Sequence, residues 1–275
     1  MSSDNHEAIK QAPLGQDTQY VCHYDPTQLF SIERANNWQK LGYDKPPFRG
    51  FDLWNAYELS WLDPKGKPQV AIAEFRIPCD SSHIVESKSF KLYLNSFNLT
   101  RFDSVEQVQQ HLVEDLSRAF GGTVSVAIQT LDAAGIIEPL KGESLDQLDI
   151  EVEHYQPAPQ LLSSAEGDPV DEQLYSHLLK SNCPVTGQPD WASIQIEYRG
   201  QPIDREGLLK YLISYREHGD FHEQCVEQIF LDIYQRCQPE QLSVYARYVR
   251  RGGLDINPYR STEAFTPDNI RLLRQ

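Results

Sequence analysis

The sequence predicts an α+β protein built from two similar halves. Strand-like runs followed by amphipathic helices occur before and again after residues 156–170, a stretch rich in Pro, Ser and Gly. The segment KLYLNSF at 91–97 also resembles KYLISY at 210–215, and a Phe opens an amphipathic helix a few residues after each of them. An internal duplication is the simplest explanation, although two unrelated amphipathic helices can match by chance.

The composition indicates a globular protein with an acidic surface. Of the 275 residues, 40% are apolar and 24% are charged, so the chain can bury a large core without disulfides or metals. The formal net charge of −15 argues against a nucleic-acid partner and against an anionic membrane surface, because both attract Lys and Arg. The polar N-terminus and the lack of a long apolar run favour a cytoplasmic protein.

In the first half, an irregular arm at 1–50 is expected to lead into an N-terminal module at 51–155. Asp103 is a plausible N-cap for a helix that the Gly121-Gly122 pair stops. The strand-like runs are at 51–63, 67–80, 86–97 and 123–131, with the helix at 103–120.

In the second half, a linker at 156–170 is expected to lead into a C-terminal module at 171–275. Asp204 is expected to open a helix that ends near Gly219. The other expected elements are a strand at 191–200, a second helix at 220–237 and a closing strand within 243–259.

The five cysteines are spread along the chain and include no CxxC pair. An odd number of widely spaced thiols does not fit a secreted disulfide framework, and a closed zinc site is not expected either. The cysteines are Cys22, Cys79, Cys183, Cys225 and Cys237.

Cys183 stands out because of its setting, the segment SNCPVTGQPDW at 181–191. Two prolines and a glycine predict a loop, in which Pro184 fixes the backbone after Cys183 and Pro189 fixes it before Asp190. A rigid loop that holds a thiol and a carboxylate suits catalysis by a thiolate nucleophile. The alternative is that Cys183 is an ordinary buried small side chain.

A second polar pair opens the segment FHEQCVEQIF. On a helix, His222, Cys225 and Ile229 share one stripe, and Glu223 lies beside His222 in the first turn. Such a pair can hydrogen-bond the polar edge of a heterocycle. The alternative is that Glu223 complements the helix dipole and His222 is solvated.

Two further segments carry charge. ESK at 86–88 places a carboxylate, a hydroxyl and an ammonium in a row, and RYVRRGG at 247–253 gathers three arginines in an acidic chain. The arginines beside Gly252-Gly253 suggest a phosphate site, although a solvated strand end explains them equally well. No GxGxxG or P-loop motif is present. Because only the first half has ESK, and only the second has the cysteine, the aspartate and the His-Glu pair, we expect one active site shared between two divergent repeats.

Taken in order, VESKSFKLYLNSF, CPVTGQPDW, FHEQCVEQIF and SVYARYVRRGGLDINPY resemble the 7-cyano-7-deazaguanine reductases, the NADPH-dependent nitrile reductases of queuosine biosynthesis. The resemblance covers nearly the whole chain from Phe51 and is to the long, two-module type. It implies tandem modules of the tunnelling fold (T-fold), in which paired helices cover one side of an antiparallel sheet. It also implies a homodimer.

The resemblance implies reduction of the nitrile of 7-cyano-7-deazaguanine to the primary amine 7-aminomethyl-7-deazaguanine, with two NADPH consumed. Cys183 resembles the nucleophile that forms a covalent thioimide, and Asp190 resembles the general acid. No metal is implied. The substrate-binding residues implied are Val85, Glu86, Ser87, His222 and Glu223. The NADPH contacts implied are Ser87, Lys88, Arg251 and Gly252.

Two other functions fit the same residues. The chain could be another T-fold enzyme, zinc-free or zinc-dependent, acting on a purine or pterin. It could also be a non-catalytic module that binds a purine-like base through Glu86 and Glu223. A further hypothesis is that Cys225 approaches Cys183 and forms a reversible disulfide with it under oxidation.

Overall fold

The structure is a computed structural model that describes residues 20–132 and 137–275. These residues form two compact units, and neither unit is one continuous stretch of chain. Unit 1 consists of residues 20–46, 51–132 and 250–255. Unit 2 consists of residues 47–50, 137–249 and 256–275.

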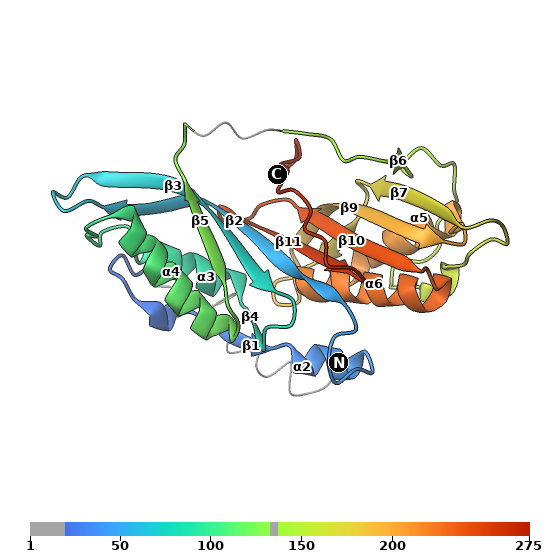
Figure 1. Cartoon of the computed structure of the whole chain (residues 1–275), viewed down its shortest axis with the longest axis horizontal. Helices are drawn as coiled ribbons and strands as arrows, with labels where there is room; N and C mark the ends of the chain where they lie inside the picture. Colours follow the sequence, from blue (N-terminus) through green and yellow to red (C-terminus); the bar gives the residue numbers. More distant parts are fainter. Residues whose placement is uncertain (1–19, 133–136) are drawn as a thin grey trace. The chain divides into compact units, whose positions relative to one another are not determined.

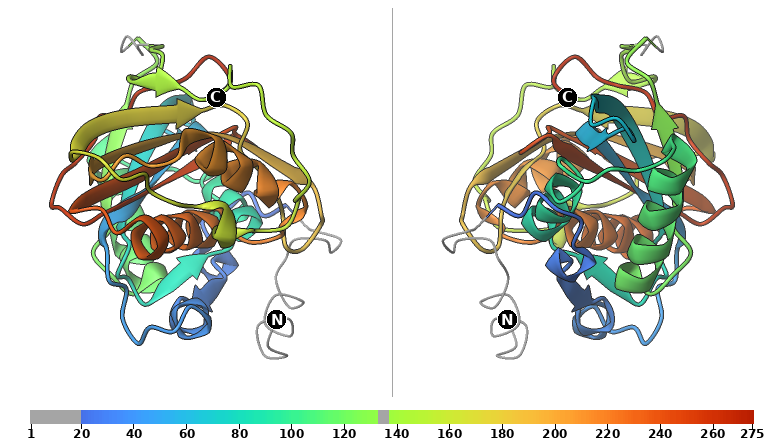
Figure 2. Two further views of the ribbon diagram at one scale, coloured as in Figure 1. Left: turned by 90° about the vertical axis from the view of Figure 1, so that its right-hand side faces the viewer. Right: turned by 90° about the vertical axis from the view of Figure 1, so that its left-hand side faces the viewer.

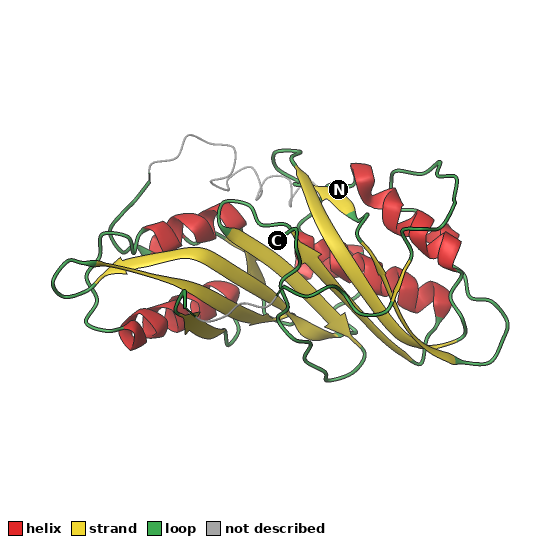
Figure 3. Ribbon diagram, turned by 90° about the horizontal axis from the view of Figure 1, so that it is seen from above, coloured by secondary structure: helices red, strands yellow, loops and turns green. Residues whose placement is uncertain are grey.

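Both units mix helices with sheets whose strands pair almost entirely antiparallel (Figure 3). The expected α+β class is therefore confirmed at this level. In the part of the chain that the structure describes, no helix is long and apolar enough to cross a membrane.

The sheet of unit 1 has the order β5-β3-β2, formed by Ser125–Gln129, Pro68–Pro78 and Arg49–Leu62 (Figure 1). Trp54 of β2 lies directly opposite Phe75 of β3, so both rings point to the same face. Phe90 and Phe120 contact Trp54 with ring centroids 4.9 and 6.1 Å away. These two residues belong to α3 (Ser87–Asn95) and α4 (Val105–Phe120), which therefore cover this face of the sheet.

Helix α4 agrees with the sequence prediction except at its start. Its cap is Ser104, whose Oγ accepts a hydrogen bond from the Gln107 N–H at 3.3 Å, and not Asp103. The helix ends at Gly121, which has a left-handed φ of 64° that favours glycine.

The strand expected within 86–97 is wrong, because most of that segment is helix α3. Glu86 caps this helix, and Phe90 and Tyr93 are fully buried at helical spacing. The short run of aromatic and apolar residues had suggested a strand, and the cap decides for the helix instead.

The expectation of an irregular arm at 1–50 is only partly correct. Residues 1–19 lie outside the described residues, and the rest contains η1 (Pro26–Gln28), β1 (Ser31–Glu33) and α2 (Ala35–Lys40). Strand β1 pairs with β4 (His83–Val85), which runs directly into Glu86. Residues 20–46 of this arm are therefore an ordered part of unit 1.

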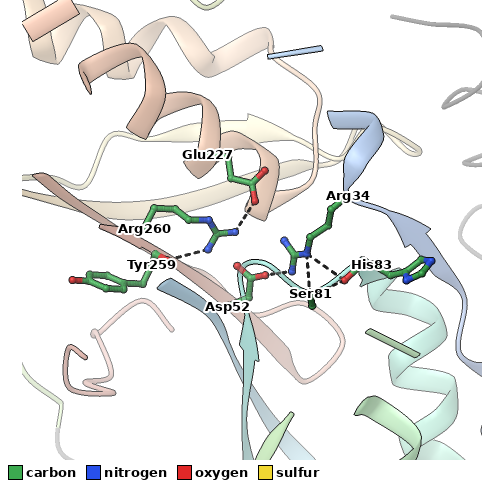
Figure 4. A network of polar contacts seen from close by, with 7 residues as sticks. All are labelled: Arg34, Asp52, Ser81, His83, Glu227, Tyr259 and Arg260. Atoms are coloured by element: carbon green, nitrogen blue, oxygen red, sulfur yellow. Dashed lines mark hydrogen bonds and ion pairs between the residues drawn. The ribbon is translucent and has the colours of Figure 1, made fainter. Parts of the chain in front are cut away.

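A buried ion pair fixes this arm. Arg34 and Asp52 are 2% and 0% exposed, and the guanidinium of Arg34 contacts the Asp52 carboxylate. Arg34 Nε also donates to Ser81 Oγ and to the His83 carbonyl, both at 3.2 Å (Figure 4). Because one side chain connects the arm, β2 and the segment before β4, these parts are held together.

The sheet of unit 2 has the order β11-β10-β9-β7-β6, and β8 pairs with β9. The left-hand view of Figure 2 shows this unit from its end, with its helices in orange. The strands are β6 (Glu143–Ser144), β7 (Val170–Ser176), β8 (Lys180–Asn182), β9 (Pro189–Gly200), β10 (Gln241–Tyr248) and β11 (Leu254–Ser261). The helices are η2 (Pro159–Leu161), α5 (Arg205–Ile213), η3 (Ser214–Glu217) and α6 (His222–Cys237).

Two expectations for the second half need correction. Helix α5 ends at Ile213 and is followed by the 3-10 turn η3, so it does not reach Gly219. The expected single closing strand is two strands, β10 and β11. The stretch at 156–170 contains η2, and Ala158 and Leu162 within it are buried, while its role as a linker stays a prediction.

The two resembling segments lie in matching elements. Residues 91–97 fall in and just after α3, and 210–215 fall at the end of α5 and in η3. Each is thus part of the first of the two longer helices in its unit. Duplication of the halves remains a prediction.

Candidate active site

Cys183 lies in a tight turn between β8 and β9. Its N–H donates to the Gln188 carbonyl at 2.8 Å, and the Gly187 N–H donates back to the Cys183 carbonyl at 3.0 Å. Gly187 has a φ of 69°, which a side chain would strain. The expected loop is therefore present over 183–188, but Asp190 is part of β9.

The pairing of β8 with β9 decides which side chains share a face. Ser181 is the direct partner of Asp190, so their side chains lie side by side on one face. Cys183 follows Ser181 by two residues, at the first position after β8, where its N–H is still paired with the Gln188 carbonyl opposite. Cys183 and Asp190 are both buried, at 5% and 4% exposed.

Asp190 meets His222 from the first turn of α6. Its Oδ2 lies 3.4 Å from His222 Nε2, while the Nδ1 atom of His222 is buried and has no hydrogen-bond partner among the described residues. A buried carboxyl beside an imidazole can share and pass a proton. The His222 ring also stacks on Tyr248 of β10, with centroids 3.7 Å apart and planes at 3°.

The residue before Cys183 ties this turn to the start of α6. The Asn182 N–H donates to the His218 carbonyl at 2.8 Å, and the Asp220 N–H donates to the Asn182 carbonyl at 3.2 Å. Lys180 Nζ donates to the Asn182 side chain and to the Arg216 carbonyl, both at 2.6 Å. These contacts place His222 and Glu223 beside the cysteine turn.

Asn182, Lys180 and Tyr248 were not identified from the sequence. The only available signal was that Lys180 and Asn182 are close to Cys183 in the sequence and that Tyr248 lies within RYVRRGG. Their partners are 34 to 36 residues away or on another strand.

The remaining predicted residues of unit 2 are also buried. Glu223 is 3% exposed, so it lies inside and is not a solvated helix-end charge. Cys225 is fully buried. Burial, reinforced by the charge of Asp220, raises the pKa of the Cys225 thiol well above its usual value, and the Ser181 hydroxyl opposes the shift.

All five cysteines are free thiols, including Cys183 and Cys225. The disulfide between these two stays a prediction. Among residues 20–132 and 137–275, no three His, Cys, Asp or Glu side chains are grouped so that they could hold a metal ion.

In unit 1, Glu86 has a structural task that the sequence did not reveal. Its two carboxylate oxygens accept hydrogen bonds from the N–H groups of Lys88 at 2.7 Å and Ser89 at 2.8 Å, which caps α3. Burial raises the pKa of the Glu86 carboxyl, and these two N–H groups oppose the shift. Each oxygen retains acceptor capacity beyond this cap.

The predicted NADPH contacts all belong to unit 1. The Arg251 N–H donates to the Leu254 carbonyl at 2.8 Å, and the Tyr57 N–H donates to the Gly253 carbonyl at 2.9 Å, which holds this turn against β2. Gly252 has a φ of 58° and open space around it. Three of these residues are partly exposed, namely Ser87, Lys88 and Arg251, and Gly252 is exposed.

The expected cluster of three arginines is wrong with respect to Arg247. Arg247 belongs to unit 2 and is 1% exposed. Its guanidinium donates to the side chains of Gln275 at 3.0 Å, Tyr245 at 2.6 Å and Asn269 at 3.0 Å. Its donors therefore serve the core of unit 2, which leaves Arg250 and Arg251 as the candidate phosphate contacts.

Two family models match the sequence. Residues 20–128 match "Nitrile reductase, 7-cyano-7-deazaguanine-reductase N-term", and residues 189–266 match "QueF-like protein". The crystal structure of the archaeosine synthase QueF-Like in the apo form is 19% identical, covering 38% of this chain and 100% of its own, with a TM-score of only 0.31.

Two curated relatives match over almost their whole length. The protein from Bordetella avium (strain 197N) is 57% identical over 272 residues, which is 97% of this chain and 99% of the relative. The protein from Bordetella pertussis (strain Tohama I) is 56% identical over 272 residues, 98% of this chain and 100% of the relative. Both are named NADPH-dependent 7-cyano-7-deazaguanine reductase.

Proposed function

This chain belongs to the 7-cyano-7-deazaguanine reductase family, and we propose on that premise that it reduces the nitrile of 7-cyano-7-deazaguanine with NADPH in queuosine biosynthesis. The product is the primary amine 7-aminomethyl-7-deazaguanine. The observation that carries the proposal is the buried Asp190–His222 pair at the start of β9, next to the closed turn that holds the buried Cys183.

Cys183 is the nucleophile in this proposal. A nitrile carbon accepts hydride poorly, and addition of a thiolate turns it into a thioimide with an imine-like carbon. After the first reduction the thiolate leaves again, which gives an imine that is ready for the second reduction. The closed turn at 183–188 supports this role, because it holds the thiol in one position throughout.

Asp190 is the proton donor. Conversion of a nitrile to an amine by two hydrides also consumes two protons, and all of them end on one nitrogen or on the adjoining carbon. A carboxyl next to the turn that holds the thiol, paired with His222 at 3.4 Å, supports repeated delivery of protons at that nitrogen. His222 restores the proton on Asp190 between the steps.

Substrate recognition is assigned to Val85, Glu86 and Ser87 and to His222 and Glu223. A deazaguanine edge offers N–H donors, for which buried carboxylates such as Glu86 and Glu223 are suitable acceptors. Glu86 binds through the acceptor capacity that its helix cap leaves over.

The residues of the Arg251 turn fit NADPH. Lys88 and Arg251 provide cations for phosphates, Ser87 provides a hydroxyl, and the open space at Gly252 lets a ligand approach the backbone. NADPH, when bound, supplies the hydride for both reductions. The chain itself binds the phosphates and orients the cofactor.

The finer architecture is part of the same proposal. The modules 51–155 and 171–275 are T-fold modules joined by a linker at 156–170, preceded by the arm at 1–50, and two copies form a cytoplasmic homodimer that works on small molecules. The antiparallel strands and paired helices of each unit support this assignment.

One experiment tests the function directly. The purified protein is mixed with 7-cyano-7-deazaguanine and NADPH, and absorbance at the NADPH band and intact mass are followed together. Two NADPH should disappear per amine formed, and substrate alone should add its own mass to the protein. Turnover without an adduct would reject the covalent route, and an adduct-free protein that consumes no NADPH would reject the activity. Metal analysis of the purified protein tests the alternative of a zinc-dependent enzyme, which would require bound zinc.

A further inference from the structure

The imidazole of His222 rests flat on the phenol ring of Tyr248. The centroids are 3.7 Å apart and the planes differ by 3°, which is a close and nearly parallel stack. The second torsion of a histidine side chain is soft, so a ring at a helix start can take several orientations. A flat neighbour on one face removes most of that freedom.

The pairing of three strands explains why Tyr248 lies there. Tyr248 is the direct partner of Ala192, which follows Asp190 by two residues on β9. Asp190 is in turn the direct partner of Ser181. By strand alternation, Tyr248, Asp190 and Ser181 therefore point to one face of the sheet, the face that receives His222.

The backbone of Tyr248 is clamped on both sides by side chains. Its N–H donates to Asn257 Oδ1 at 3.1 Å, and its carbonyl accepts from Gln275 Nε2 at 3.1 Å. Gln275 Nε2 also donates to Asn257 Oδ1 at 2.9 Å, so the two clamping side chains support each other. All three residues are fully buried or nearly so.

The hydroxyl of Tyr248 lies at the buried end of the ring. Burial, reinforced by the Cys225 thiol, raises the pKa of the Tyr248 phenol well above its usual value, so the phenol stays neutral. Neither the Tyr248 hydroxyl nor the Ser181 hydroxyl has a hydrogen-bond partner among the described residues, so the ring is fixed by its strand and its packing and not through its hydroxyl.

We propose that Tyr248 is a positioning residue for the reaction: its ring holds the His222 imidazole in the orientation that brings Nε2 to Asp190. The inference rests on the proposed function, since it assigns to the Asp190–His222 pair the delivery of protons to the nitrile nitrogen. Tyr248 itself touches neither the thiol of Cys183 nor the reacting atoms in this account, and it acts through His222.

The proposal separates the ring of Tyr248 from its hydroxyl. In Tyr248→Phe the stack remains, so kcat should stay within about threefold of the parent value. In Tyr248→Met a side chain of similar volume remains, but the flat ring that stacks on His222 is lost. The kcat should then fall by about 100-fold, as expected when a catalytic group shifts by about 1 Å. The KM for the nitrile should change by less than about threefold in both variants. Tyr248→Leu serves in place of Tyr248→Met if the latter does not fold.

Tyr245 offers a matched control on the same strand. It is also a buried tyrosine, but it points to the opposite face of β10 and packs against Tyr259 with centroids 5.7 Å apart. Tyr245→Met should lower the melting temperature and leave kcat within about twofold. A loss of kcat equal to that of Tyr248→Met would show a general packing effect and overturn the proposal.

A double variant tests whether Tyr248 acts through His222. Tyr248→Met combined with His222→Ala should be no slower than His222→Ala alone, because the group that Tyr248 positions is already gone. Multiplied losses, an unchanged kcat in Tyr248→Met or a rise in KM alone would each overturn the proposal. Failure of the proposed function looks different: the parent protein would then consume no NADPH with the nitrile, whatever residue stands at position 248.

Discussion

At the scale of single residues, the chemistry depends on which side of a strand each side chain faces. Ser181 and Asp190 share a side because they are direct partners in the pairing of β8 with β9, and Cys183 follows at the start of the turn. A register shifted by one residue would turn Asp190 to the other face of the pair. The spacing of seven residues between Cys183 and Asp190 therefore works only with this turn and this register.

The nucleophile is tested by Cys183→Ala. This variant should show neither NADPH consumption nor a mass increase on incubation with the nitrile, because no other thiol lies in the turn. The measurement is intact mass spectrometry with the absorbance assay, and Cys79→Ala is the control. An adduct on the Cys183→Ala protein would disprove the assignment.

The proton donor is tested by Asp190→Asn. The amide has the same shape but cannot donate an acidic proton, so kcat should drop by about 100-fold or more while the nitrile still binds. Isothermal titration with the nitrile and steady-state kinetics separate the two effects. Undiminished turnover would remove the acid role from Asp190.

At the scale of elements, short segments set the positions of the candidate site residues. The arm strand β1 pairs with β4, and the Glu86 N–H donates to the Phe30 carbonyl at 2.9 Å. Arg34 ties that arm to Asp52 and to the segment before β4. The N-terminal arm thereby supports the start of α3, where Glu86, Ser87 and Lys88 lie.

The arm contact is tested by Arg34→Met. Removal of one partner leaves the Asp52 carboxylate buried without its charge partner, so the free energy of unfolding should fall by about 3–5 kcal/mol. Urea denaturation measures this loss. The exposed pair of Arg199 with Glu240 is the control, since Arg199→Met should cost about 1 kcal/mol or less. Equal losses in the two variants would contradict the role of the Arg34 contact.

The turn between β10 and β11 is tested by Arg251→Ala. If Arg251 binds a phosphate of NADPH, the Kd for NADPH should rise by about 10-fold or more, which corresponds to a lost charge-assisted hydrogen bond. The rate of adduct formation with the nitrile alone should be little changed. The Kd is measured by titration with NADPH, and the rate of adduct formation is measured with the nitrile alone. A selective loss of nitrile binding would reject the assignment of Arg251 to NADPH.

At the scale of the whole molecule, the units are not simple halves of the sequence. Residues 47–50 belong to unit 2, although they precede most of unit 1, and residues 250–255 belong to unit 1. Phe48 shows what this means: its ring lies 5.5 Å from that of Phe230 in α6, and the guanidinium carbon of Arg260 lies 5.4 Å from it. Arg260 also forms a buried ion pair with Glu227 at 2.9 Å (Figure 4).

This division is tested by Phe48→Ala. Loss of a buried aromatic ring should cost about 3–5 kcal/mol, and the loss of hydrogen-exchange protection should appear in α6. Phe51→Ala is the matched control, because Phe51 lies in unit 1 under the guanidinium of Arg76 at 5.2 Å, and its effect should appear in β2 and β3. Loss of protection in β3 but not in α6 for Phe48→Ala would contradict the division.

The sequence by itself determined the features that depend on neighbours along the chain. Strand alternation in β3 and β9, the apolar stripe of α4, the cap at Asp204 and the motifs that identify the family are all readable within about 20 residues. The segment at 86–97 is the exception, because a short apolar run does not distinguish a strand from a helix until its cap is recognised.

Only the tertiary structure decided which polar groups meet. The contact of Asn182 with His218, the stack of His222 on Tyr248 and the burial of Arg247 depend on strand register and on contacts between distant segments. Such contacts form because buried polar groups must be satisfied wherever packing places them, and no local pattern encodes the partner. The motifs therefore named the residues of the candidate site, and the fold determined how those of unit 2 are held.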